Sequence, residues 1–129
     1  MTNFSPLLQK AIQMQEEGRL EEASGCYREI LEQDPYHGDA NHLLGLVAHQ
    51  QGNDESALHF VNIAIKVHPD IAMYHANQGR ILQANGSNLE AVSAYSSALR
   101  LKPGDGNTLS DLAGALLANG DLKQAELFV

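Results

Sequence analysis

The chain has 129 residues, of which 43% are apolar, 5% aromatic and 19% charged, and its formal net charge at pH 7 is −8. This length favours one domain, and the acidic balance argues against nucleic-acid and anionic-membrane partners, because phosphate binding requires clustered Lys and Arg. The chain has a single cysteine, no signal-peptide pattern and no apolar run near the roughly 20 residues that cross a bilayer, so we expect a cytoplasmic protein.

Helical spacing of apolar residues runs through the whole chain. The first helix is expected to open at Ser5-Pro6, with Ser5 as N-cap and Pro6 at the first helical position. The predicted helices lie at about 6–17 and 20–33, 38–51 and 54–67, 72–85 and 88–101, and 106–119 and 122–129. Because the connections are only a few residues long, successive helices must be antiparallel neighbours.

Turn signals recur every 34 residues and separate these helices. One glycine stands inside each pair, where a tight turn needs positive φ, and a proline closes each of the first three units. Ser87 with Glu90, and Asp121 with Gln124, have the spacing of capping boxes at the helices that follow. The turn residues are Gly18, Gly52, Gly86, Gly120, Pro35, Pro69 and Pro103.

Small residues recur at the same period inside the helices. Gly45 and Gly79 stand in helix interiors, where glycine costs about 1 kcal/mol relative to alanine. They therefore indicate a close helix crossing that a side chain would obstruct. The full set of small positions is Ala11, Gly45, Gly79 and Ala113 in the first helices and Ala23, Ala57, Ala91 and Ala125 in the second helices.

This register resembles the tetratricopeptide repeat (TPR), whose signature combines Leu-Gly, Tyr, Ala and Pro at fixed offsets. The third unit matches at Gly79, Leu82, Ala91, Tyr95 and Pro103, although no unit has the signature Trp. The resemblance implies an all-α fold, a right-handed superhelix of antiparallel helix pairs, in one domain over residues 1–129. Its repeats would span about 4–37, 38–71, 72–105 and a truncated 106–129.

In TPR proteins the first helix of each unit lines a concave groove, so the resemblance implies a non-enzymatic scaffold that binds a peptide or partner protein there. Asn77 and Arg80 are the candidates for holding a ligand backbone or carboxylate, since Asn both donates and accepts and Arg presents a planar fork. The register assigns to the groove Leu8, Gln9, Ile12, His42, Leu43, Leu46, His49, Met73, Asn77, Arg80, Gln83 and Asp111.

The sequence gives little indication of catalysis or metal binding. No catalytic motif is present, so no enzyme activity and no cofactor are expected. His42 and His49 lie seven residues apart on one helix, about 10 Å along its axis, which is too far to chelate one ion. The six histidines are therefore expected to be surface or half-buried residues, and no metal site is predicted. The TPR subtype that clamps chaperone carboxylates matches only at Asn77, and Asp111 would repel a carboxylate.

Two alternative functions remain open. The run His42-Leu43-Leu44-Gly45-Leu46 is similar to early repeats of O-GlcNAc-transferase-like bacterial proteins, so the chain could be the substrate-recruiting arm of a larger transferase. The array also stops inside its fourth unit, which suggests the N-terminal piece of a longer protein or a self-assembly module that pairs through this end. Apolar residues expected to be uncovered there are Leu112, Leu116, Leu127 and Phe128.

Overall fold

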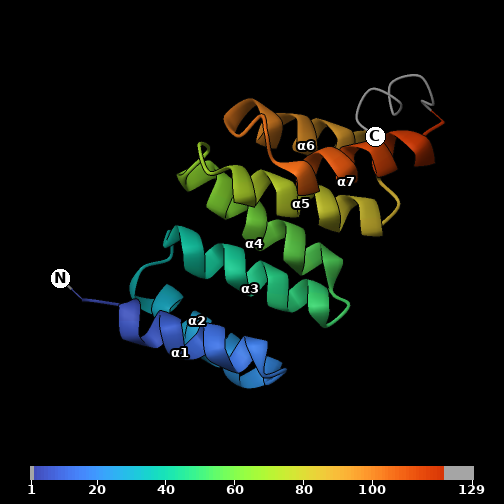
Figure 1. Ribbon diagram of the computed structural model, residues 1–129. Helices are drawn as coiled ribbons and strands as arrows, with labels where there is room; N and C mark the ends of the chain where they lie inside the picture. The colour runs from blue at the N-terminus through green and yellow to red at the C-terminus, as the bar shows by residue number, and fades with distance from the viewer. Residues whose placement is uncertain (1, 121–129) are drawn as a thin grey trace. The chain divides into compact units, whose positions relative to one another are not determined.

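The computed structural model describes residues 2–120, and every regular element within them is an α-helix (Figure 1). The chain forms two compact units, Met1–His68 and Pro69–Val129. Unit 1 contains α1 (Ser5–Glu16), α2 (Leu20–Gln33), α3 (Gly38–Gln50) and α4 (Asp54–Val67). Unit 2 contains α5 (Ala72–Ala84), α6 (Asn88–Leu101) and α7 (Gly106–Ala118). The all-α prediction is confirmed, and the seven helices lie within one residue of their predicted bounds.

The eighth predicted helix, at 122–129, lies outside the described residues, as do the Asp121–Gln124 capping box, Leu127 and Phe128. Leu112 and Leu116 are buried, with 4% and 2% of their surface exposed, so the prediction that they are uncovered was wrong. The helix that carries them, α7, packs on α5 and α6. Within the described part, no helix is long and apolar enough to span a membrane.

The periodic glycines end the first helix of each pair in the same way. Their φ angles are 79° at Gly18, 82° at Gly52, 83° at Gly86 and 84° at Gly120, in the left-handed region that favours glycine. At Gly52 the glycine N–H donates to the His49 carbonyl at 3.0 Å, and the Asn53 N–H donates to the Ala48 carbonyl at 2.8 Å. This pair of bonds is the Schellman arrangement, which satisfies carbonyls at a helix end. The predicted glycine turns are therefore confirmed.

The predicted N-cap Ser5 is wrong, whereas Ser87 is the N-cap residue of α6 but lacks the predicted capping bond. Ser5 is already helical and Phe4 is the N-cap of α1, because the Asn3 Oδ1 atom accepts from the Ser5 N–H at 3.0 Å and starts the helix one residue earlier. Ser87 precedes α6 but makes no side-chain capping bond. Its ψ of 66° is far from the extended backbone that lets a short hydroxyl reach the first free N–H groups. At the same position before α4, the longer Asn53 side chain does accept, from the Ser56 N–H at 3.2 Å.

The close helix crossing predicted from the helical glycines is confirmed in both units. A Cβ added to Gly45 would lie 2.7 Å from Val61 Cγ2 and 2.9 Å from the Ala57 carbonyl oxygen, on α4. A Cβ added to Gly79 would lie 2.5 Å from Tyr95 Cε1, on α6. Because glycine has no side chain at these two positions, α3 can approach α4 closely and α5 can approach α6 closely.

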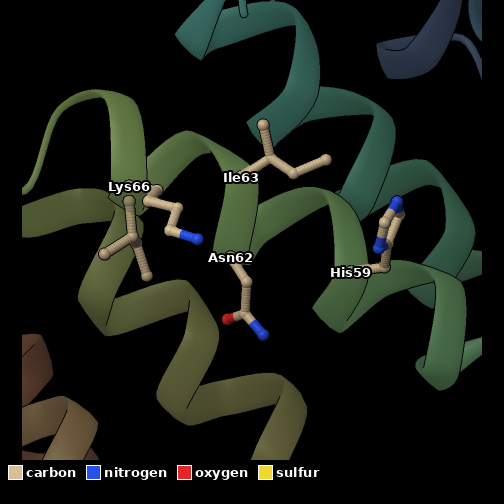
Figure 2. Close-up of a pocket in the computed structure, with 5 residues that line it drawn as sticks. His59, Asn62, Ile63 and Lys66 are labelled. Atoms are coloured by element: carbon tan, nitrogen blue, oxygen red, sulfur yellow. The ribbon is translucent and has the colours of Figure 1, made fainter.

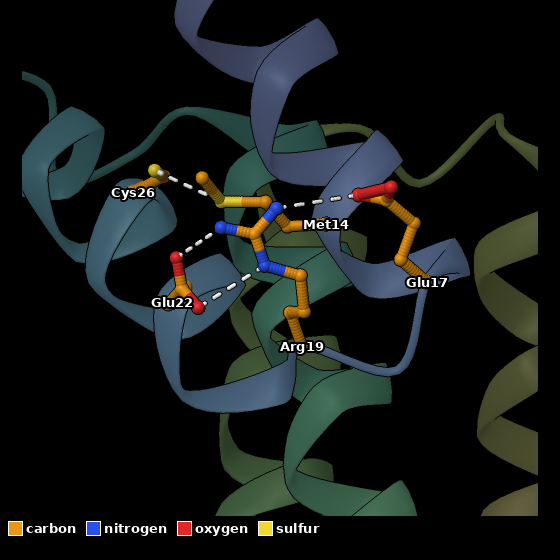
Figure 3. Close-up of polar contacts among 5 residues, drawn as sticks. All are labelled: Met14, Glu17, Arg19, Glu22 and Cys26. Carbon is orange, nitrogen blue, oxygen red and sulfur yellow. Dashed lines mark hydrogen bonds and ion pairs between the residues drawn. The ribbon is translucent and has the colours of Figure 1, made fainter.

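The core of unit 1 joins its first three helices. Its buried members are Ala11, Met14, Ala23, Tyr27, Leu44 and Val47. Cys26 packs against this cluster with its Sγ atom 3.9 Å from Met14 Sδ (Figure 3). Figure 3 also shows Arg19 beside the first glycine turn, bridging the Glu17 and Glu22 carboxylates. Hydrogen bonding to Arg19 lowers the pKa of the Glu22 carboxyl, an exposed interaction that adds little stability.

Candidate functional site

The predicted lining residues of unit 1 range from buried to exposed side chains. Ile12 on α1 and Leu46 on α3 have equivalent register and are both half-buried, whereas Gln9 is exposed. Leu8 and Leu43 are half-buried because they pack against the core cluster of this unit. The two adjacent helices therefore present Ile12 and Leu46 as partly accessible apolar groups.

His42 differs from the surface histidine predicted from the sequence. Only 2% of its surface is exposed, and burial lowers the pKa of its imidazole to about 4. The Asp39 carboxylate opposes this effect, but desolvation dominates. His42 is therefore a buried neutral residue at pH 7 rather than an open lining group.

Polar residues at the ends of α1 and α3 are held by specific bonds. The Gln15 Oε1 atom accepts from the Tyr27 hydroxyl at 2.7 Å, and its Nε2 atom donates to Gln50 Oε1 at 2.8 Å. His49, at the same register as Gln15, pairs instead with Asp54 at 2.7 Å between Nδ1 and Oδ1. This change has a simple cause, since Val61 replaces the tyrosine in the second repeat and offers no hydroxyl.

In unit 2 the structure brings three predicted residues together. Arg80 Nε donates to Asp111 Oδ2 at 2.7 Å, and Arg80 Nη1 donates to Asn77 Oδ1 at 2.8 Å. Arg80 and Asp111 are partly exposed, with 39% and 35% of their side chains accessible. The Asp111 carboxylate therefore neutralises Arg80 locally, while the pair stays accessible to a ligand.

Gln83 and Met73 complete the predicted lining of α5. Gln83 Oε1 accepts from the Tyr95 hydroxyl at 2.7 Å, which repeats the bond of Gln15 with Tyr27. Burial raises the pKa of Tyr95 to about 12, so the phenol stays protonated and donates at neutral pH. Met73 is 62% exposed at the start of the helix.

Sequence reasoning did not assign a supporting role to Tyr27, Tyr95 or Asp54. A periodic signal could have identified the tyrosines. A Gln in the first helix of a repeat and a Tyr in its second helix occur together twice, 68 residues apart. The Asp54 bond had no such periodic signal.

The described surface includes two open depressions that concern the predicted lining. One lies on α4, where Figure 2 shows His59, Asn62, Ile63 and Lys66, with Ile65 completing its lining. It belongs to a second helix and includes none of the predicted residues. The other lies along α1 and includes two of them, Gln9 and Ile12, beside Lys10, Gln13 and Glu16. Among the described residues, no group of three His, Cys, Asp or Glu side chains could hold a metal ion.

Helix pairs that repeat along the chain, with a positive-φ glycine at the end of each first helix, define an α-helical repeat protein. Family models described as tetratricopeptide repeat match residues 8–66 and 82–129. The chain belongs to the tetratricopeptide repeat family.

Solved structures share this fold. MamA from Desulfovibrio magneticus RS-1 is 20% identical with a TM-score of 0.88, over 98% of this chain and 71% of that chain. The first TPR of Spaghetti (RPAP3), solved bound to an HSP90 peptide, is 20% identical with a TM-score of 0.86, over 91% of this chain and 93% of that chain. These two show the fold alone.

An O-GlcNAc transferase of Thermobaculum terrenum is 30% identical with a TM-score of 0.84. The similarity covers 90% of this chain but only 23% of the transferase chain. The repeats of this chain therefore resemble those of O-GlcNAc-transferase-like arrays. No curated protein matches the chain in sequence.

Proposed function

We propose that this TPR protein is a non-enzymatic interaction module that binds a peptide segment along the first helices of its repeats. One observation carries the proposal. Buried small residues recur at one position of each first helix, and two of them, Gly45 and Gly79, lie against the second helix of their pairs. The residue that follows each small residue is half-exposed at the same register in every described repeat. Those half-exposed residues are Ile12, Leu46, Arg80 and Gly114.

The first helices of each unit offer their own chemistry to a ligand. Ile12 and Leu46 of unit 1 suit an apolar ligand side chain, and Arg80 with Asn77 of unit 2 suits polar groups of a peptide. Since Asp111 already pairs with Arg80, a ligand carboxylate would have to compete with a charge in place. The surface therefore favours a peptide without a carboxylate at this point, which is consistent with the poor match to the carboxylate-clamp subtype.

The test is selection of ligands from a displayed library of random peptides, followed by fluorescence anisotropy with the enriched peptide. Transient assembly requires an affinity near 1 μM, about −8 kcal/mol. Asn77→Ala combined with Arg80→Ala is expected to weaken binding at least about tenfold, because it removes hydrogen-bond groups worth over 1.4 kcal/mol together.

Arg100→Ala is the matched control. This arginine lies in the same unit on the second helix α6, where it donates to Ser97 Oγ at 2.9 Å, and its removal makes the same change in net charge. Helicity measured by circular dichroism should be unchanged in both variants. Equal affinity of the double variant and the native chain would reject this binding surface.

A second function is favoured by the similarity to the transferase. We propose as the alternative that the chain recruits substrates for a glycosyltransferase-like enzyme, with the same surface serving that purpose. The similarity is confined to 23% of that enzyme chain, so the full-length reading frame provides the test. An encoded transferase domain following these repeats would support the alternative, and its absence would reject it.

Self-assembly through the C-terminal end stays a prediction, since that end lies outside the described residues. Light scattering of the purified chain over a range of concentrations tests it, and a monomer throughout would reject it.

A further inference from the structure

Gln83 and its counterpart Gln15 make the same hydrogen bond through the amide oxygen but differ in the bonding of the amide nitrogen. Each accepts a hydrogen bond from a tyrosine hydroxyl at 2.7 Å, from Tyr95 and Tyr27 respectively. That bond fixes the amide so that its oxygen faces the tyrosine and its nitrogen faces the neighbouring first helix. In unit 1 the nitrogen then donates to Gln50 Oε1 at 2.8 Å.

Unit 2 has no equivalent of the Gln50 side-chain oxygen. The residue 68 positions after Gln50, at the end of α7, is Ala118, which has no side-chain oxygen. Among the residues that the structure describes, the Gln83 Nε2 atom has no hydrogen-bond partner. An oriented N–H donor therefore remains available on α5, where unit 1 uses the same group within its own fold.

The Gln83 amide packs against Gly114 of α7. A Cβ built on Gly114 would lie 3.4 Å from Gln83 Nε2, so the amide stands directly over the α7 backbone where a side chain is missing. At the same register in unit 1 stands Leu46. Arg80 and Asp111 lie three residues before Gln83 and Gly114 on their helices, and their charges already compensate each other. The surroundings of the donor thus favour a neutral acceptor over an anion.

We propose that the Gln83 amide N–H, oriented by Tyr95 and set over Gly114, is a specificity-determining donor that binds a neutral carbonyl oxygen of the peptide ligand. This inference rests on the proposed function, and it assigns the ligand chemistry at this turn of α5. The carbonyl belongs either to the peptide backbone or to an Asn or Gln side chain, because both present the same acceptor.

Two variants test the donor with the peptide selected on the native chain. Gln83→Glu keeps an oxygen for the Tyr95 hydroxyl but has no N–H, so affinity should fall about tenfold or more, the loss expected for an unpaired ligand carbonyl. Ala118→Gln restores the acceptor that Gln50 provides in unit 1 and should occupy the donor, weakening binding about three- to tenfold. Ala118 is exposed, so this second variant should fold normally.

Gln15→Glu is the matched control, since it adds the same charge where the amide is already bonded, and its affinity should stay within about twofold of the native value. Native affinity in both Gln83→Glu and Ala118→Gln, with binding still lost in the Asn77/Arg80 double variant, would overturn this inference and leave the proposed function standing. Loss in none of the three would instead reject the proposed function.

The source of the carbonyl is separated with altered peptides. Ester replacement of single backbone amides weakens one backbone carbonyl at a time, and an alanine scan removes side-chain amides. A peptide change that abolishes the difference between the native chain and Gln83→Glu identifies the acceptor. If neither series contains such a change, the direct bond is rejected.

Discussion

Replacing Gly45 by alanine tests how closely α3 and α4 approach. Alanine should gain about 1 kcal/mol in helix propensity. Overpacking costs about 1–3 kcal/mol, and here the upper end applies, because one of the clashing atoms is the Ala57 backbone oxygen at 2.9 Å, which cannot rotate away. The net result should be a loss of about 2 kcal/mol in the free energy of unfolding. Ala11, at the same register in the first repeat, is fully buried, so a helix pair of this fold can accommodate a methyl group there, which limits the cost.

Gly25→Ala is the control in the same unit. Gly25 lies inside α2, and a Cβ there would meet no atom within 4 Å. This variant should therefore gain about 1 kcal/mol from helix propensity alone. The two substitutions are chemically identical, so their difference of about 3 kcal/mol isolates the cost of the close crossing.

The assay is urea unfolding followed by circular dichroism, with the free energy extrapolated to water for each variant. Equal slopes of the free energy against urea would show that the variants unfold to equally exposed states. If Gly45→Ala stabilised the chain as much as Gly25→Ala, the close approach of α3 and α4 would be refuted.

Three further predictions concern capping, hydrogen bonding and pH. Asn53→Ala should cost about 1 kcal/mol in urea unfolding by removing an N-cap, whereas Ser87→Ala should cost under about 0.5 kcal/mol because that hydroxyl makes no capping bond. Tyr27→Phe should cost about 1 kcal/mol, and a value near zero would contradict the bond to the Gln15 amide. His42 has a folded pKa of about 4, below its unfolded value near 6.5, so the unfolded chain binds its proton first. Stability should therefore fall by up to about 3 kcal/mol as pH drops from 6.5 to 4, and His42→Gln should remove this part of the pH dependence, measured by urea unfolding at each pH.

The helices and their turns could be predicted from the sequence because each rests on local rules repeated four times. Gly52 and its equivalents mark positive φ, and Gly45 marks a close helix crossing. The positions of these glycines in the repeat were therefore enough to predict the turns and the crossing. The caps were harder to predict, since Ser87 has the right residue type but a backbone angle that depends on how its hairpin packs.

The candidate site was harder to predict from the sequence, because tertiary contacts determine which of its side chains are exposed and which are paired. His42 has lining register but is buried, and nothing in its local pattern separates it from Leu46, which is half-exposed. Arg80 was predicted as a ligand fork, whereas its bond to Asp111 joins residues 31 positions apart in the chain. The donor of Gln83 emerges only when three distant positions are compared with their counterparts in unit 1.

The glycine turns have a consequence for how this chain acquires its structure. Each turn is closed by hydrogen bonds that reach back no more than five residues, as from Asn53 to Ala48. Contacts this local close quickly, since little loop entropy is lost before they form. A hairpin can therefore assemble while later residues are still being synthesised on the ribosome, and within unit 1 the finished α1–α2 pair offers α3 a surface on which to fold.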